Sequence, residues 1–296
     1  MKIWDSHTHL FPPEIFNNIE KYAALNPFFA ALCTRPPGNK GTEQVWKTPE
    51  EALVDADRAG VWGFILQGVF FWDDPGLQRM NNDFIAETFQ KYPDRIKGYA
   101  GVNLTKGAKA CIEEIERCAK LGFVGVGELH TGANEIGFDD PIFIEVAECA
   151  QDMGLVLCAH CSAPVSHKFA GSWSTPLAPI PDLVKRLPKL KLQLAHLGGG
   201  MPFFETSPKY DGLFENVYYD FAANPLTYGI RVLRGVIDMV GADRVLFGSD
   251  YSLTLYPYQT REPGWDMFVN DIRDNAGLTE EEWNKVMGEN LLRFLG

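Results

Sequence analysis

The sequence has few of the features that mark membrane, secreted or nucleic-acid-binding proteins. Its 296 residues contain no apolar run near the roughly 18 residues of a membrane span, and its start, MKIWDSHTHLF, reaches an acid and two histidines before a signal-peptide core could form. Lysine and arginine are dispersed and the formal net charge is −12. Phosphate binding needs clustered cations. We therefore expect a cytoplasmic protein that binds neither a membrane nor nucleic acid.

Cysteine is scarce as well, and its six positions do not suggest a disulfide scaffold in a chain of this size. Cys158 and Cys161 form a C-x-x-C pair. A redox pair of this kind needs its first cysteine at a helix N-terminus, where the thiolate is stabilised. This pair ends the apolar run LVLCAHC, which is typical of a strand. We predict that both cysteines are structural.

Short β-branched or aromatic runs alternate with segments of helical periodicity along the whole chain. The predicted strands are 2–6, 61–67, 96–102, 123–128, 155–160, 190–196, 216–221 and 244–249. The clearest helical segments are 49–60, 80–91, 107–121, 140–153, 180–187, 228–241 and 279–295. Eight strands with helical connections predict an α/β fold, a (β/α)8 TIM barrel, in a single domain over residues 1–296. A doubly wound sheet would need a glycine-rich phosphate turn after its first strand, and DSHTHLFPP is not one.

Three connections are too long for plain barrel loops, namely 11–47, 161–179 and 251–278. They follow predicted strands 1, 5 and 8, so all three lie at the C-terminal end of the barrel. Active sites of this architecture form at that end. We therefore expect the functional residues there.

Polar side chains gather at the ends of the predicted strands. His7 and His9 are two residues apart in strand 1, so their side chains share a face. His160, His196 and Asp250 end strands 5, 6 and 8, and Glu128 ends strand 4. A single buried histidine is more often a hydrogen-bonded core residue than a ligand, but a random scatter would rarely place four of six histidines at these ends. Imidazole and carboxylate ligands suit zinc, manganese or iron, so the pattern predicts a catalytic metal centre.

Four ordered motifs resemble the amidohydrolase superfamily: DSHTHL, the strand-end His160, AHLGGGMP at 195–202 and LFGSDY at 246–251. Residues 81–102 and 288–296 resemble its amidohydrolase-related branch, which includes aminocarboxymuconate-semialdehyde decarboxylase and related aromatic acid decarboxylases. The resemblance covers essentially the whole chain. It implies that four residues are metal ligands and that a fifth, His196, handles protons beside the metal or binds a second ion. The four implied ligands are His7, His9, His160 and Asp250.

Strand 4 departs from the superfamily pattern. A carboxylated lysine often bridges two metals there, but no lysine ends strand 4 in this chain. Instead, GVGEL resembles the strand-4 glutamate motif of the TatD-type nucleases, in which the carboxylate is a ligand. Glu128 is thus either a ligand or a carboxylate that orients a histidine. We expect one or two divalent ions, with zinc favoured over manganese.

Two reactions fit this set of residues. In hydrolysis, Asp250 takes the proton of metal-activated water and His196 binds the developing oxyanion or a second metal. In non-oxidative decarboxylation of an aromatic or unsaturated acid, Asp250 or His196 protonates the substrate carbon before carbon dioxide leaves. Glu128 could support a second metal, and few arginines are well placed to bind a substrate carboxylate. We therefore predict hydrolysis of an amide, ester or lactone, with decarboxylation as the alternative.

Aromatic residues in the long connections suggest walls for a flat, partly apolar small molecule. They could equally pack as a lid that does not touch a substrate. The candidate substrate-binding residues are Phe71, Trp72, Trp173 and Arg261. The sequence leaves a homodimer open and does not identify the substrate.

Overall fold

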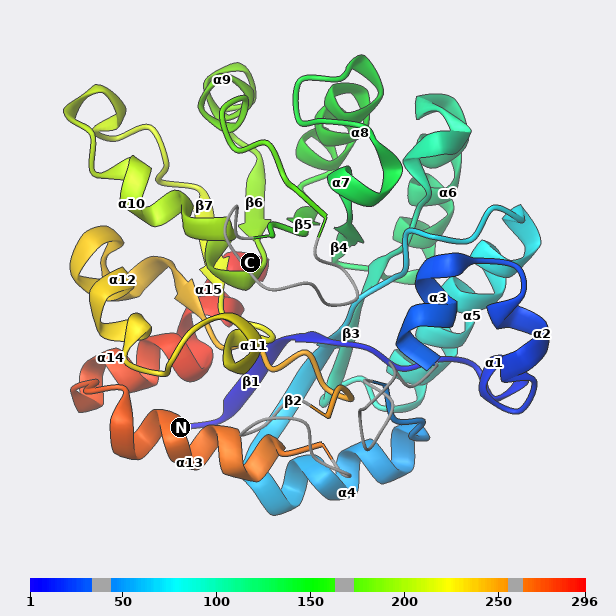
Figure 1. Cartoon of the computed structure of the whole chain (residues 1–296), viewed down its shortest axis with the longest axis horizontal. Coiled ribbons are helices and arrows are strands. Elements are labelled where there is room, and N and C mark those ends of the chain that lie inside the picture. Colours follow the sequence, from blue (N-terminus) through cyan, green and yellow to red (C-terminus); the bar gives the residue numbers. More distant parts are fainter. Residues whose placement is uncertain (34–43, 163–172, 255–262) are drawn as a thin grey trace.

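The computed structural model describes residues 1–33, 44–162, 173–254 and 263–296, and it places eight parallel strands in a barrel surrounded by helices (Figure 1). Neighbouring strands pair in chain order, and the barrel closes where the Asp250 N–H donates to the His7 carbonyl over 2.9 Å. The predicted TIM barrel is confirmed. Its strands are β1 (Ile3–Thr8), β2 (Val61–Leu66), β3 (Ile96–Ala100), β4 (Gly125–Leu129), β5 (Val156–Ala159), β6 (Lys191–Leu194), β7 (Val217–Asp220) and β8 (Val245–Leu246).

The helices on the outside of the barrel follow the predicted periodicity, and further short helices occupy the connections. The helices that follow strands in the barrel pattern include α4 (Pro49–Ala59), α5 (Pro75–Lys91), α6 (Ala108–Leu121), α8 (Pro141–Asp152), α9 (Ile180–Arg186) and α12 (Val232–Val240). The chain ends in α14 (Glu280–Asn284), a π-helical segment η5 (Lys285–Glu289) and α15 (Asn290–Leu295). The short 3-10 segments are η1 (Leu104–Lys106), η2 (His196–Gly200), η3 (Pro208–Tyr210) and η4 (Ala242–Arg244).

Two of the long connections contain helices that the sequence did not predict. The connection after β1 holds α1 (Pro13–Phe16), α2 (Ile19–Ala23) and α3 (Pro27–Cys33), and the one after β8 holds α13 (Trp265–Asn275). Shorter helices also follow β4, β6 and β7, namely α7 (Thr131–Asn134), α10 (Met201–Glu205) and α11 (Asn224–Thr227). A helix of four to seven residues gains little from its own hydrogen bonds, so tertiary packing decides whether it forms.

Side chains fill the barrel interior, as the alternation of each strand requires. In β5, Cys158 packs inside the barrel with Trp4 and Tyr99, whereas Leu157 faces the surrounding helices. Leu291 of α15 belongs to the interior cluster as well. The interior is therefore a packed core, so a ligand of this architecture is expected above it, where the strands end.

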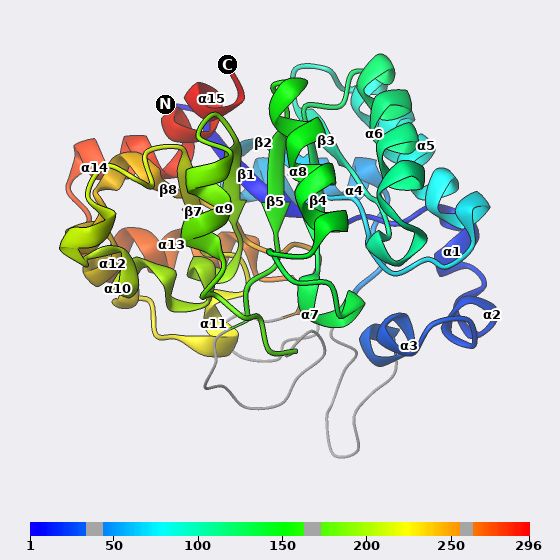
Figure 2. The same ribbon diagram turned by 90° about the horizontal axis from the view of Figure 1, so that it is seen from above.

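The two ends of the barrel differ in what covers them. Figure 2 shows α3, α7 and α11 at the end opposite the two chain termini. These three helices follow the C-terminal ends of strands, so this is the end where the sequence predicted the site. In the described residues, no helix combines the length and apolar character needed to cross a bilayer.

The C-x-x-C pair has the buried, unreactive surroundings predicted for structural cysteines. Cys158 and Cys161 are both fully buried and both are free thiols. Burial raises the pKa of the Cys158 thiol to about 12 and raises that of Cys161 as well. Neither side chain has the stabilised thiolate of a redox cysteine.

Candidate metal centre and active site

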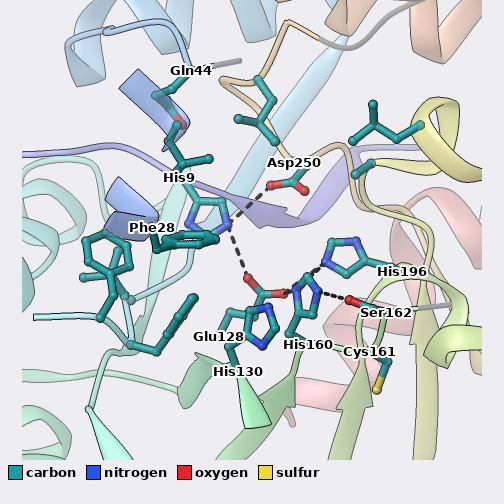
Figure 3. Close-up of a pocket in the computed structure, with 18 of the residues that line it drawn as sticks. His9, Phe28, Gln44, Glu128, His130, His160, Cys161, Ser162, His196 and Asp250 are labelled. Carbon is teal, nitrogen blue, oxygen red and sulfur yellow. Dashed lines mark hydrogen bonds and ion pairs between the residues drawn. The ribbon is translucent and has the colours of Figure 1, made fainter. Parts of the chain in front are cut away.

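His7, His9, Glu128 and Asp250 converge at the C-terminal end of the barrel, where the ends of β1, β4 and β8 meet. Figure 3 shows His9, Glu128 and Asp250 of this set. The Nε2 atoms of His7 and His9 lie 3.2 Å apart. The Asp250 carboxylate oxygen Oδ1 lies 3.4 Å from Nε2 of His9 and 3.9 Å from Nε2 of His7. Oε2 of Glu128 lies 3.6 Å and 3.8 Å from the same two nitrogens. All four side chains are at least 85% buried, with His9 the most exposed at 15%.

The distances among His7, His9 and Asp250 fit ligands of a single metal ion, and Oε2 of Glu128 lies near the two histidine nitrogens. Ligands bound at about 2.0–2.2 Å in a tetrahedron lie roughly 3.3–3.6 Å apart, close to the spacing observed here. Two imidazole nitrogens that face each other at 3.2 Å also need a cation or a proton between them, because each presents a lone pair. The residues present therefore fit a divalent metal, and the donor set of imidazole and carboxylate suits zinc or manganese.

His160 and His196 lie on the other side of Glu128. Oε1 of Glu128 is 2.8 Å from Nδ1 of His160 and 3.1 Å from Nε2 of His196, and these two nitrogens are 3.0 Å apart. The second ring nitrogen of His160 lies 2.9 Å from the Ser162 hydroxyl. The structure thus brings all of the predicted ligands together, with Glu128 between the two groups of histidines. That His160 itself binds the metal remains a prediction.

Charge and burial compete within this cluster. Burial disfavours the anionic form of Glu128, but the neighbouring His160 and His7 outweigh it and hold the pKa of Glu128 well below its usual range. Burial likewise opposes protonation of His196, but its hydrogen bond to Glu128 and the charges of Glu128 and Asp250 raise the pKa of His196 to about 9. The protein alone therefore keeps Glu128 anionic, as a metal ligand requires.

The backbone is strained at the two residues that were predicted to handle protons. His196 has φ 56° and Asp250 has φ 66°, a left-handed conformation that is uncommon for residues other than glycine. After His196 the left-handed backbone continues through Leu197 and three glycines, so the AHLGGG motif forms a left-handed turn. Residues held in this way are common where a side chain must be aimed at a functional site.

A pocket opens above the metal-binding residues. It spans about 890 Å³, part of it open to solvent, and its described lining includes no lysine or arginine. His9, Glu128, His160, His196 and Asp250 form its polar floor. The other lining residues are Phe11, Phe28, Leu32, Gln44, Gly68, Val69, Phe70, Phe71, His130, Cys161, Ser162, Ala223, Leu226, Thr227, Tyr228 and Leu253.

The predicted substrate-binding residues lie in different places. Phe71 lines the pocket, but Trp72 is not among the described lining residues. Trp72 is buried behind it, and its indole N–H donates to Oδ1 of Asn81 over 2.8 Å. Trp173 is 41% exposed near the rim, with its ring 5.4 Å from that of Phe28. Arg261 lies outside the described residues.

Sequence reasoning missed Asp220. Asp220 ends β7 and accepts a hydrogen bond from Nδ1 of His7 over 3.1 Å. Its position at a strand end is the same signal that identified Asp250. Asp5, in β1, accepts from the backbone N–H groups of His7 (2.9 Å) and Ser249 (3.1 Å) and from the Trp265 indole over 2.8 Å. Burial raises the pKa of Asp5 to about 7.

Comparisons with known proteins find relatives that match nearly the whole chain. The chain is 23% identical to a 2-amino-3-carboxymuconate-6-semialdehyde decarboxylase of Dictyostelium discoideum, over 99% of this chain and 91% of that protein. The crystal structure of 5-carboxyvanillate decarboxylase from Sphingomonas paucimobilis matches with a TM-score of 0.75 at 21% identity, covering 99% and 98% of the two chains. A dihydroxybenzoic acid decarboxylase from Polaromonas, solved with bound manganese and the inhibitor 2-nitroresorcinol, matches with a TM-score of 0.68 at 20% identity, covering 99% and 96%.

The family assignment rests on a match that extends over nearly the whole chain. The model of the amidohydrolase family matches residues 4–296. This range includes the C-terminal ends of all eight strands. The chain belongs to the amidohydrolase family.

Proposed function

We propose that this protein is a metal-dependent, non-oxidative decarboxylase of an aromatic or unsaturated carboxylic acid. The observation that carries the proposal is a metal-binding cluster at the floor of a pocket with aromatic walls. The named activities of the relatives favour decarboxylation over the hydrolysis that the sequence led us to prefer. Two relatives of similar fold were solved with bound manganese, which supports a divalent ion in this protein.

The walls of the pocket suit a flat substrate. Phe28, Phe70 and Phe71 lie against one another, with ring centroids 5.0–5.4 Å apart. They continue to His130, whose ring stacks on that of His160 at 3.8 Å. A ring or a conjugated chain can pack against these faces while its carboxylate reaches the polar floor.

Asp250 and His196 supply the proton in this proposal. Both line the pocket floor, and Asp250 is one of the four converging residues, so either can reach a substrate carbon held above the centre. A bound divalent cation would hold the substrate carboxylate and an adjacent oxygen in place. The proton adds to the carbon that carries the carboxylate. The bond from that carbon to the carboxylate then breaks, its electron pair returns to the conjugated system, and carbon dioxide leaves.

The test is carbon dioxide release. We expect the manganese- or zinc-loaded protein to release it from at least one member of a panel of aromatic acids that includes 2,6-dihydroxybenzoate and 5-carboxyvanillate. His7→Ala should abolish release, because His7 belongs to the metal-binding cluster. Phe203→Ala, at a 68% exposed position on α10, is the matched control and should keep full activity. Absence of release across the panel, with metal bound, would contradict the proposal.

Hydrolysis is the second candidate, and one observation favours it. The two oxygens of Glu128 face different pairs of histidines, as a carboxylate between two ions would. Two ions about 3.5–4 Å apart can hold a bridging hydroxide that attacks an amide, ester or lactone. Two equivalents of metal per chain, with ester or lactone cleavage in place of carbon dioxide release, would support this candidate over decarboxylation.

A further inference from the structure

A fully buried carboxylate lies beside the metal-binding cluster and contacts both His7 and His196. Asp220 is 0% exposed and its two oxygens accept four hydrogen bonds. Oδ2 accepts from Nδ1 of His7 over 3.1 Å and from Nε2 of Gln193 over 2.7 Å. Oδ1 accepts from the backbone N–H of His196 over 3.2 Å and from that of Ala222 over 3.0 Å.

The contact with His7 determines which of its nitrogens can bind metal. An imidazole that donates from Nδ1 to a carboxylate keeps a lone pair on Nε2, and Nε2 of His7 is the atom that faces His9, Glu128 and Asp250. Carboxylates that hold metal-binding histidines in this way fix the ring and raise its basicity.

The contact with His196 acts through the backbone. The left-handed residue His196 is held at its N–H by Asp220, and its ring Nδ1 lies 2.9 Å from the carbonyl oxygen of Ala222. The N–H of Ala222 donates to the same Asp220 oxygen. The Asp220 carboxylate thus binds the backbone N–H of His196 and the backbone N–H of Ala222, whose carbonyl oxygen contacts the His196 ring.

We propose that Asp220 is a positioning residue that sets the tautomer of His7 and the orientation of both His7 and His196, and that Gln193 holds Asp220 in place. The inference rests on the metal site of the proposed function but not on which reaction occurs there. Tyr99 extends the support, since its hydroxyl donates to Oε1 of Gln193 over 3.3 Å. If the carboxylate had only a structural role, replacing it would change the stability of the protein without changing its metal affinity.

The first test compares zinc affinity in wild type and Asp220→Asn, by competition with a chelator. Asparagine has one acceptor oxygen and cannot accept from both His7 and the two backbone N–H groups. We expect zinc affinity to fall by about 10- to 100-fold, the usual effect of losing a carboxylate behind a metal-binding histidine. NMR of zinc-loaded protein with ¹⁵N-labelled histidine gives a second readout, in which the Nδ1-protonated signal of His7 should be lost. Unchanged affinity with an unchanged His7 signal would overturn the inference.

A second variant keeps the test decisive if Asp220→Asn does not fold. Gln193→Met keeps Asp220 but removes its donor, so zinc affinity should fall in the same direction by a smaller factor. Gln67→Met is the matched control, because Gln67 is as buried as Gln193 and also donates to the Ser6 carbonyl, but it makes no described contact with Asp220. Equal affinities in the two glutamine variants would overturn the inference. Failure of the wild type itself to bind zinc or manganese would instead contradict the proposed function.

Discussion

At the scale of single residues, strand geometry places the side chains of the candidate metal centre. His7 and His9 share a face because they are two apart in a strand, and Asp250 follows the last strand of the barrel. The left-handed backbone at Asp250 and His196 depends on how the turns after β8 and β6 are held by the rest of the barrel.

Glu128 is the residue whose role most needs a direct test. If its Oε2 atom binds the metal with His7 and His9, Glu128→Gln should lower metal affinity by roughly 10-fold or more, because a neutral amide replaces an anionic ligand. Equilibrium dialysis with elemental analysis measures this. Glu148→Gln, on the outer surface at α8, serves as the control. An affinity equal to that of wild type would show that Glu128 only orients its histidines.

Two residues show why the site was predicted incompletely from the sequence. Trp72 was expected to form a wall of the pocket, but the indole N–H needs a partner when buried and finds Asn81 of α5, which draws the ring away from the pocket. Asp220 has the same strand-end position as Asp250, but it lies outside the motifs from which the site was predicted. Its four hydrogen bonds, which join residues far apart in the chain, show its place in the site.

At the scale of elements, the strands and longer helices were predicted well because their apolar periodicity is local information. The capping boxes at Thr48 and Thr279 begin α4 and α14 as their sequences indicate. The helix α13 was missed because no side chain caps its first turn, which Gly264 precedes. It is held instead by tertiary contacts such as the stacking of Trp265 on Tyr251 at 4.3 Å.

The left-handed turn after β6 gives a prediction about glycine. A Cβ at position 199 would lie 2.7 Å from the Ser162 backbone oxygen, and φ there is +60°. Gly199→Ala should therefore displace the end of β5 or the His196 turn, destabilise the protein by about 1–3 kcal/mol, and lower activity more than stability alone explains. Gly200→Ala is the control, since φ is +96° but no atom lies within 4 Å of its Cβ. Equal losses of Tm and activity in the two variants would show that the close contact is irrelevant.

The capping box of α14 predicts a pH dependence of stability. The Arg234 side chain, followed by the Thr279 backbone N–H, lowers the pKa of Glu282 to about 2, from an ordinary value near 4.5. A carboxylate with a lowered pKa stabilises the fold above its unfolded pKa, and this contribution is lost as the pH falls toward the folded pKa. Glu282→Gln should lower Tm at pH 7, and the difference from wild type should shrink between about pH 4.5 and pH 2. A difference independent of pH would contradict this origin.

At the scale of the whole molecule, the metal-binding cluster joins parts of the chain that are far apart in sequence. His7 lies near the start of the chain, Glu128 near its middle and Asp250 near its end. The barrel brings a carboxylate oxygen of Glu128 and one of Asp250 within 4 Å of Nε2 of His7. Burial disfavours the charged forms of these side chains, and a bound cation would compensate the two carboxylates. Such an ion would hold together strand ends that belong to distant parts of the chain.

Removal of the metal should therefore destabilise the entire barrel. An ion that binds only the folded chain, at about 1,000 times its Kd, stabilises it by about 4 kcal/mol, which corresponds to a Tm increase of roughly 6–7 °C for a chain of 296 residues. Differential scanning calorimetry before and after chelation should show this difference, and added zinc or manganese should restore the higher Tm. His9→Ala removes one of the converging nitrogens, so its Tm should respond far less to chelation. A wild-type Tm that is unchanged when bound metal is stripped, as verified by elemental analysis, would mean that the ion does not couple the strand ends and that the cluster is stable without it.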